Sequence, residues 1–162
     1  MSHRAAVIGD VILGRPFEKD APLKGIEIGC LAGEFDREIL GIFPHLKMTA
    51  IDPNPQYLQI YQNVKEYMDR LRIIESTSDN AIKFLQREYH FVFIDGDHSY
   101  EQTRRDILNY WQVILKGGIL AGHNYDVPEN PRSAHPGVAQ AVIEIFGDRF
   151  KAGQDATWWI YV

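Results

Sequence analysis

Ionisable side chains follow directly on an apolar stretch in the middle of the chain. The four residues "FVFI" run straight into a segment that contains Asp95, Asp97 and His98. A short, continuous apolar run is typical of a strand that is buried on both faces. A second polar pair, His123 and Asn124, follows the apolar stretch "GILAG". Carboxylate and imidazole groups can serve in acid–base catalysis or in binding, although they are also common in ordinary turns.

These side chains must be positioned by strands and helices, which the chain indicates by alternating short apolar stretches with longer amphipathic ones. Such alternation predicts an α/β fold with a mainly parallel sheet and helices on both faces. The last two strands have no helix between them, so we expect an antiparallel hairpin at one edge of the sheet. The expected strands cover 23–29, 46–52, 71–76, 90–95, 118–122, 149–153 and 157–162, and the expected helices cover 34–43, 55–68, 78–88, 99–114 and 137–146.

Polar residues stand at the carboxyl ends of four of the expected strands. Glu27 and Gly29 end the first strand, Asp52 ends the second, Asp95 the fourth, and His123 follows the fifth. Ligands of open parallel sheets bind outside the carboxyl ends of the strands. We therefore expect these residues to gather along one edge of the sheet.

The turn after the first strand, "EIGCLAGEF", contains Gly29 and Gly33 in a G-x-x-x-G pattern. A dinucleotide site prefers G-x-G-x-x-G, because a pyrophosphate must approach the backbone closely. The looser turn, with Glu27 beside it, suits a ligand that has cationic groups and no phosphates. Asp52 follows about 20 residues later, where an acid can bind the two hydroxyls of a ribose. The alternatives are a plain glycine turn and an aspartate that caps the turn in "DPNP".

Composition bounds the class of protein. The 162 residues fit one domain. Of these residues, 45% are hydrophobic and 24% are charged, which is ordinary for a globular protein. The net charge of −5 and the absence of a basic run argue against a nucleic-acid partner. The chain has one cysteine, Cys30, so it forms no intrachain disulfide, as suits a reducing cytosol. The early apolar run "AAVIGDVIL" is too short for a membrane span, so we expect a cytoplasmic protein without a membrane partner.

Three stretches resemble class I S-adenosylmethionine-dependent methyltransferases: "IEIGCLAGEF", "AIDPNP" and "FVFIDGDHSYEQTRRDILNYWQVILKGGILAGHNYD". The last is most similar to the methyltransferase domain 24 group, which is related to catechol-type and metal-dependent sugar O-methyltransferases. The resemblance runs from about Lys24 to the C-terminus. It implies a three-layer, Rossmann-like methyltransferase fold with a seven-stranded, mostly parallel sheet, in the order 3-2-1-4-5-7-6 with strand 7 antiparallel.

The resemblance also implies a binding site for S-adenosylmethionine. The glycine turn would line the amino-acid moiety and the sulfonium, and Asp52 would bind the ribose. Thr77 and Ser78 fall where the family meets the adenine amino group, although Ser78 can equally be a helix cap. The residues expected to bind the cofactor are Glu27, Gly29, Cys30, Gly33, Asp52, Pro53, Asn54, Thr77, Ser78 and Asp95.

For catalysis, the resemblance implies that Asp95 and His98 act at the acceptor, with His98 as the base. It also implies a divalent metal held by Asp95, His123 and Asn124. The relatives usually have an aspartate where this chain has His123, and an imidazole would favour Mn²⁺ or Zn²⁺ over Mg²⁺. Alternatively there is no metal, and one of the two histidines acts directly as the base.

We therefore expect an enzyme that methylates a hydroxyl of a sugar or of another small molecule. One alternative is a non-catalytic module that binds S-adenosylmethionine, and another is an NAD(P)-dependent oxidoreductase, which the glycine spacing disfavours. Residues 23–162 would form the methyltransferase domain. Residues 1–22 would form an N-terminal segment that covers the cofactor or joins a homodimer, and the loop 124–138 would be a wall of the acceptor pocket.

Overall fold

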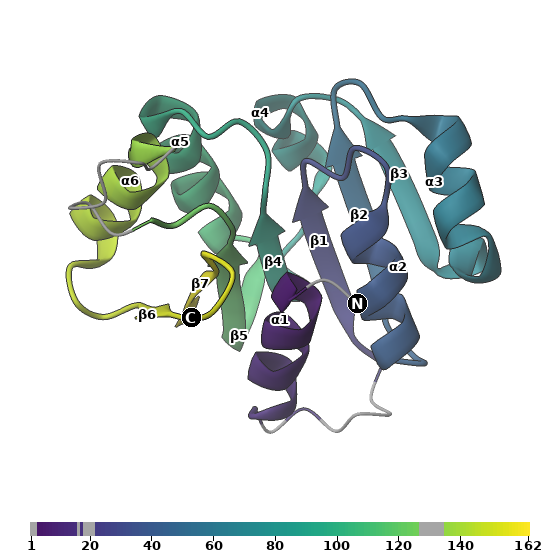
Figure 1. Ribbon diagram of the computed structural model, residues 1–162, viewed down its shortest axis with the longest axis horizontal. Coiled ribbons are helices and arrows are strands. Elements are labelled where there is room, and N and C mark those ends of the chain that lie inside the picture. The colour runs from purple at the N-terminus through teal and green to yellow at the C-terminus, as the bar shows by residue number, and fades with distance from the viewer. Residues whose placement is uncertain (1–2, 16, 18–21, 127–134) are drawn as a thin grey trace.

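The computed structural model describes residues 3–15, 17, 22–126 and 135–162, which form one seven-stranded sheet with helices on both sides (Figure 1). The order of the strands is β3-β2-β1-β4-β5-β7-β6. The strands are β1 (Lys24–Ile28), β2 (Lys47–Asp52), β3 (Leu71–Glu75), β4 (Tyr89–Ile94), β5 (Ile114–Gly122), β6 (Lys151–Ala152) and β7 (Trp158–Tyr161).

The first five strands are parallel, and β7 runs antiparallel to both β5 and β6. This confirms the predicted strand order and the antiparallel hairpin at one edge. The α-helices are α1 (His3–Leu13), α2 (Glu34–Ile42), α3 (Tyr57–Val64), α4 (Ser78–Ala81), α5 (Tyr100–Trp111) and α6 (Pro136–Phe146), and the 3₁₀-helices are η1 (Lys65–Arg70) and η2 (Ile82–Phe84).

The side chains of β4 alternate between two hydrophobic cores. Phe91 and Phe93 pack with residues of α1, α2 and α3, whereas Val92 and Ile94 pack with residues of α4, α5 and α6. The ring of Phe93 stacks on that of Phe35 from α2, with 4.2 Å between the centroids. Strand β4 is thus buried on both faces, as its apolar sequence predicts. Its carboxyl end is fixed by the packing of both layers.

Strand β5 begins at Ile114, which was expected to belong to the preceding helix, and three further elements differ from the sequence prediction. Helix α1 was not expected as a helix, and the expected helix over 55–68 divides into α3 and η1. The expected helix over 78–88 is only the short α4 followed by η2. After η2 the chain is extended at Leu85, and the backbone N–H groups of Glu88 and Tyr89 donate to the carbonyl of Val113. These bonds bring the chain alongside β5, so the helix cannot continue.

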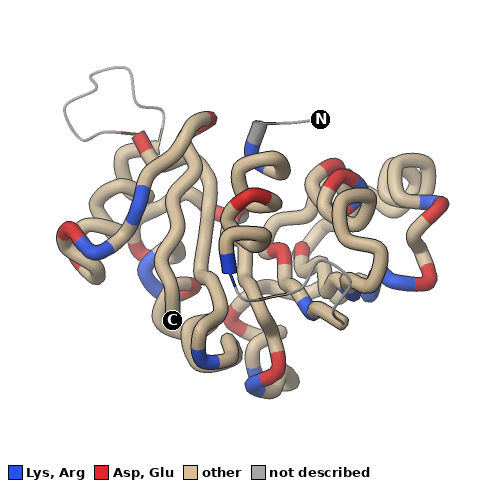
Figure 2. The backbone as a smooth tube through the Cα atoms, turned by 90° about the horizontal axis from the view of Figure 1, so that it is seen from below, with Lys and Arg blue, Asp and Glu red and all other residues tan. Residues whose placement is uncertain are grey.

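Positions with Lys or Arg and positions with Asp or Glu are interspersed along the described backbone (Figure 2). Within the same part of the chain, no helix combines the length and the apolar character needed to cross a membrane.

Candidate functional site

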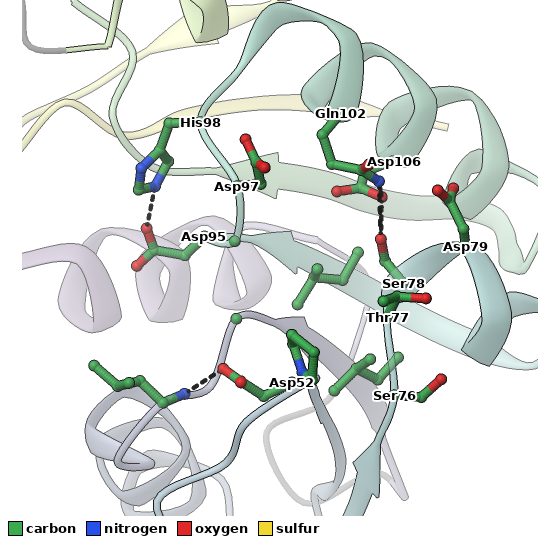
Figure 3. A pocket seen from close by; sticks show the side chains of 16 residues that line it. Asp52, Ser76, Thr77, Ser78, Asp79, Asp95, Asp97, His98, Gln102 and Asp106 are labelled. Atoms are coloured by element: carbon green, nitrogen blue, oxygen red, sulfur yellow. Dashed lines mark hydrogen bonds and ion pairs between the residues drawn. The ribbon is translucent and has the colours of Figure 1, made fainter.

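A cavity of about 520 Å³ lies at the carboxyl ends of β1 to β4, where the polar strand ends were expected to meet. Its volume is in the range of small-molecule sites. Figure 3 shows Asp95 and His98 at one end of the cavity and Ser78, Asp79 and Asp106 at the other. The residues that line it are Ile28, Gly29, Leu31, Ile51, Asp52, Pro53, Ser76, Thr77, Ser78, Asp79, Asp95, Gly96, Asp97, His98, Gln102 and Asp106.

The turn after β1 depends on Gly29. This residue has a φ of 87°, which glycine adopts without strain. A Cβ atom at Gly29 would lie 2.2 Å from the carbonyl oxygen of Asp95. The backbones of the two strand ends therefore approach closely, and only a residue without a side chain fits between them.

The carboxylate of Asp52 is fixed by backbone donors at the end of β2. One oxygen accepts from the N–H of Leu31 at 2.9 Å, and the other accepts from the N–H of Asn54 at 2.8 Å. An ionised carboxylate has about four acceptor positions, so each oxygen retains capacity for a further donor. Asp52 is buried in the protein yet lines the cavity, so it presents preoriented acceptors to a ligand.

At the opposite end, Ser78, Gln102 and Asp106 form a buried network. The hydroxyl of Ser78 donates to Oδ1 of Asp106 at 2.6 Å, and Nε2 of Gln102 donates to the same oxygen at 3.0 Å. The other oxygen of Asp106 has no hydrogen-bond partner among the described residues. Burial raises the pKa of Asp106 to about 6. Ser78 thus anchors this network, and its hydroxyl does not cap α4.

Three basic side chains surround the carboxylate of Asp95. Nη1 of Arg4 donates to Oδ2 at 2.8 Å, while Nε2 of His98 and Nδ1 of His123 each lie 3.4 Å from Oδ1. Burial opposes ionisation of Asp95, but hydrogen bonds from the two histidines and the charge of Arg4 hold its pKa below the usual range. The hydrogen bond with Asp95 in turn raises the pKa of His123.

Two further carboxylates, Glu27 and Asp36, are fully enclosed on the α2 side of the sheet. Burial raises the pKa of Asp36 to about 6, and burial together with the nearby Asp36 raises the pKa of Glu27 well above its usual range. Oε2 of Glu27 and both oxygens of Asp36 have no hydrogen-bond partner among the described residues. Both carboxyl groups therefore keep their protons to a higher pH than exposed carboxyl groups do.

Some of the predicted site residues line the cavity and others do not. Glu27 is buried behind it, and Cys30 is buried, with a pKa raised by burial and by nearby carboxylates. Gly33 is the N-cap of α2, with a φ of 72°, and Asn54 is exposed. Their roles stay predictions, as do those of the residues that do line the cavity, namely Gly29, Asp52, Pro53, Thr77, Ser78, Asp95 and His98.

The predicted metal site does not fit a resident metal. Of its members, Asp95 and His123 are in contact, but both oxygens of Asp95 face basic nitrogen atoms. Across residues 3–15, 17, 22–126 and 135–162, no three histidine, cysteine, aspartate or glutamate side chains are grouped so that they could hold a metal ion. The remaining predicted ligand, Asn124, follows His123 with a left-handed backbone, at φ 58°.

Sequence reasoning missed Arg4, Gln102 and Asp106. Gln102 and Asp106 lie one turn apart on α5, and this i, i+4 spacing was the signal that they share a face. Arg4 gave no such signal, because its segment had no predicted partner. Asp97 is not the N-cap of α5: that position belongs to Ser99, and Asp97 accepts a hydrogen bond from the N–H of Ser99 at 2.8 Å.

A family model described as a methyltransferase domain, that of the methyltransferase domain 24 group, matches residues 26–125. The chain belongs to this methyltransferase family. The match runs from within β1 to beyond the end of β5 and therefore includes every strand end that faces the cavity. No curated protein matches the chain in sequence.

Solved structures share the fold of this methyltransferase at low sequence identity. A structure from Staphylococcus aureus, provisionally assigned as a caffeoyl-CoA O-methyltransferase, has 16% identity and a TM-score of 0.73, over 100% of this chain and 84% of that one. A provisionally assigned O-methyltransferase from Klebsiella pneumoniae has 18% identity and a TM-score of 0.72, over 98% and 77%. Spermidine synthase from Thermotoga maritima has 16% identity and a TM-score of 0.60, over 85% and 52%. At such identities the likeness shows the fold alone.

Proposed function

We propose that this methyltransferase transfers a methyl group from S-adenosylmethionine to a hydroxyl of a small molecule. The observation that carries the proposal is that Asp95 and His98, a carboxylate and imidazole in contact, line the same cavity as the preoriented Asp52. The names of two structural neighbours support an oxygen acceptor. The size of the cavity and the mixed charge along the backbone favour a small acceptor over a nucleic acid.

The cavity fits the cofactor that the family implies. Asp52 offers carboxylate oxygens for ribose hydroxyls, and Asp106 has a buried oxygen without a partner among the described residues. When bound, S-adenosylmethionine supplies an electrophilic methyl group on a sulfonium. Gly29 lets the backbones that follow β1 and β4 approach closely where both border the cavity.

The contact between Asp95 and His98 defines which nitrogen acts as the base. Nε2 of His98 lies 3.4 Å from Oδ1 of Asp95, and in the tautomer in which Nε2–H donates to this carboxylate, Nδ1 is the acceptor nitrogen. We propose that Nδ1 takes the hydroxyl proton as the acceptor oxygen bonds to the methyl carbon and the carbon–sulfur bond breaks. Asp95 then stabilises the imidazolium, as the carboxylate does in a catalytic triad. No step requires a metal ion.

Calorimetry with S-adenosylmethionine and S-adenosylhomocysteine tests the cofactor. We expect both to bind the natural chain and the Asp52→Ala variant to bind at least about tenfold more weakly, since it loses charge-assisted acceptors. A titration of NADH fluorescence is the comparison. Binding of NADH in place of the two methionine derivatives would contradict the proposal and favour an oxidoreductase.

The transfer is tested by incubating the protein and S-adenosylmethionine with each member of a panel of sugars and phenols. The release of S-adenosylhomocysteine measures turnover. We expect turnover with a member of the panel and a loss of about 100-fold or more in His98→Ala, the scale of general-base catalysis. His45→Ala, which removes an exposed imidazole elsewhere, is the matched control. A chain that binds the cofactor while no hydroxyl is methylated would instead be a non-catalytic binding module.

A further inference from the structure

Helix α1 brings an arginine into contact with Asp95, which lines the cavity. Ala5, Ile8 and Ile12 of this helix are almost completely buried in the core that they share with α2, β4 and β5. The packing fixes the first turn of α1, which carries Arg4. The backbone N–H of Arg4 also donates to Asp155 at 3.2 Å. Arg4 is therefore held at both its backbone and its side chain.

The guanidinium of Arg4 lies among acidic groups. Nη1 donates to Asp95 at 2.8 Å, and Nη2 lies 4.0 Å from the carboxylate of Glu34. Only 22% of the Arg4 side chain and 10% of the Asp95 side chain are exposed, so this ion pair is largely shielded from water. The enclosed carboxylate of Glu27 also interacts electrostatically with Arg4.

These contacts occupy the coordination positions that a metal would need at Asp95. A divalent cation binds carboxylate oxygens directly, and it is repelled by a guanidinium that already contacts one of them. The histidines lie by the other oxygen. The resemblance implies that His123 stands where the relatives usually have an acid, whose negative charge would help to hold such a cation. The single positive charge of Arg4 therefore balances the negative charge of Asp95, and the site does not need the two charges of a divalent metal.

We propose that Arg4 takes the position at Asp95 that a divalent metal takes in the metal-dependent O-methyltransferases that this chain resembles. The positive charge at the acceptor site is then supplied by the guanidinium of Arg4, a side chain of the protein itself. Arg4 acts as a positioning residue: it holds Asp95, which orients His98, and it transfers no proton because a guanidinium stays protonated. The inference rests on the proposed function for its role, but the displacement of a metal is testable without turnover.

The test measures binding of Mn²⁺ to metal-free protein through the electron paramagnetic resonance signal of the free ion. The variants are Arg4→Met, which keeps an unbranched side chain without its charge, and Arg4→Lys, which keeps the charge. Arg15→Met is the matched control, because Arg15 bonds to the carbonyl of Gly117 and not to Asp95. A double variant, Arg4→Met with Asp95→Asn, shows whether any new site uses Asp95.

We expect Arg4→Met to bind Mn²⁺ at least about tenfold more tightly than the natural chain, because a repelling charge has been removed. Arg4→Lys and Arg15→Met should bind as weakly as the natural chain, and the double variant should lose the gain. The proposal is overturned if the natural chain binds Mn²⁺ through Asp95 with the affinity of Arg4→Met. It is equally overturned if Arg4→Met shows no gain, or if the gain survives in the double variant.

Folding and cofactor binding are followed in the same samples. Circular dichroism and the affinity for S-adenosylhomocysteine show whether Arg4→Met is folded. Should the variant unfold, Arg4→Gln, which retains hydrogen-bond donors without the charge, replaces it with the same expected gain. Failure of every variant and of the natural chain to bind S-adenosylhomocysteine would contradict the proposed function, while the Mn²⁺ result would still decide the position of Arg4.

Discussion

Glu27 and Asp36 bring two carboxyl groups into the interior with few donors to satisfy them. Each proton that they hold in the folded chain is released when the chain unfolds in neutral water, because their pKa values are raised by burial. Asp36, with a pKa of about 6, binds a proton in the folded state at a pH where the unfolded state does not. The folded state therefore loses stability as the pH rises from about 4 to about 6.

Asp36→Asn should reduce this loss. Between pH 4 and pH 7 we expect the free energy of unfolding of the natural chain to fall, relative to that of the variant, by on the order of 2 kcal/mol. Urea denaturation at a series of pH values measures the difference. Asp10→Asn removes an equal charge from an exposed position of α1 and serves as the control. Parallel curves for the natural chain and Asp36→Asn would contradict the expectation.

At the residue scale, sequence reasoning predicted the acids and the histidines and missed their partners. Asp95, His98 and His123 stand at strand ends, so parallel topology alone brings them near one edge. Arg4 lies 91 residues from Asp95 along the chain, and a single cation on an unassigned segment has no periodicity that predicts such a contact. Charge pairing across the fold is set by packing, which is why the metal expected from the resemblance did not fit.

Among the elements, the turn between β1 and α2 makes the strictest demand on residue type. Gly29→Ala would place a Cβ atom 2.2 Å from the carbonyl oxygen of Asp95 at a φ of 87°. We expect the variant to lose more than about 3 kcal/mol of unfolding free energy, since strain and overlap add. Gly147→Ala has a φ of 61° with open space around it, so it adds backbone strain without overlap and should cost about 1–3 kcal/mol. Thermal denaturation measures both variants. Equal losses of unfolding free energy in Gly29→Ala and Gly147→Ala would show that the ends of β1 and β4 can move apart.

Helix α1 should contribute to stability through its buried face. Ile8 is completely buried, whereas 44% of Leu13 on the same helix is exposed. We expect Ile8→Ala to lower the free energy of unfolding by about 2–5 kcal/mol. Leu13→Ala should lower it by under about 1 kcal/mol, because its side chain leaves less of a cavity. Denaturant titrations compare the two, and a small effect of Ile8→Ala would mean that α1 is only loosely docked.

The element boundaries that sequence predicted well are those with strong local patterns. The strands β1, β2 and β4 have continuous apolar patterns, and their observed bounds lie within two residues of the expected ones. The segment over 78–88 has a helical pattern, but its last residues bond to Val113 and follow β5 instead. Tertiary hydrogen bonds thus overrode local propensity there.

The whole molecule should report the cofactor through its melting temperature. A ligand that binds only the folded state adds about 2.7 kcal/mol at a concentration of 100 times its Kd. For a chain of 162 residues this corresponds to a rise of roughly 5–10 °C. We expect this rise with S-adenosylhomocysteine in the natural chain and a smaller one in Asp52→Ala at the same concentration. Differential scanning fluorimetry measures both, and equal shifts would mean that Asp52 does not contact the ligand.

Strand order was the feature of the whole molecule that sequence predicted most fully. Alternating strands and helices restrict a parallel sheet to few arrangements, and the resemblance selected one of them. The cavity followed from that order, since it lies where the strands end. Which residues border it did not follow, because Gln102 and Asp106 come from the helix after β4 and depend on how α5 packs.

The bond from the backbone of Arg4 to Asp155 joins residues 151 positions apart. During synthesis on a ribosome, the first helix therefore waits for almost the whole chain before this contact can close. Strand β7 adds to the delay, since it must insert between β5 and β6 after both are made. Such distant pairings fold slowly, because chain entropy is lost before the contacts form. We therefore expect the contact between Arg4 and Asp155 to be among the last to form.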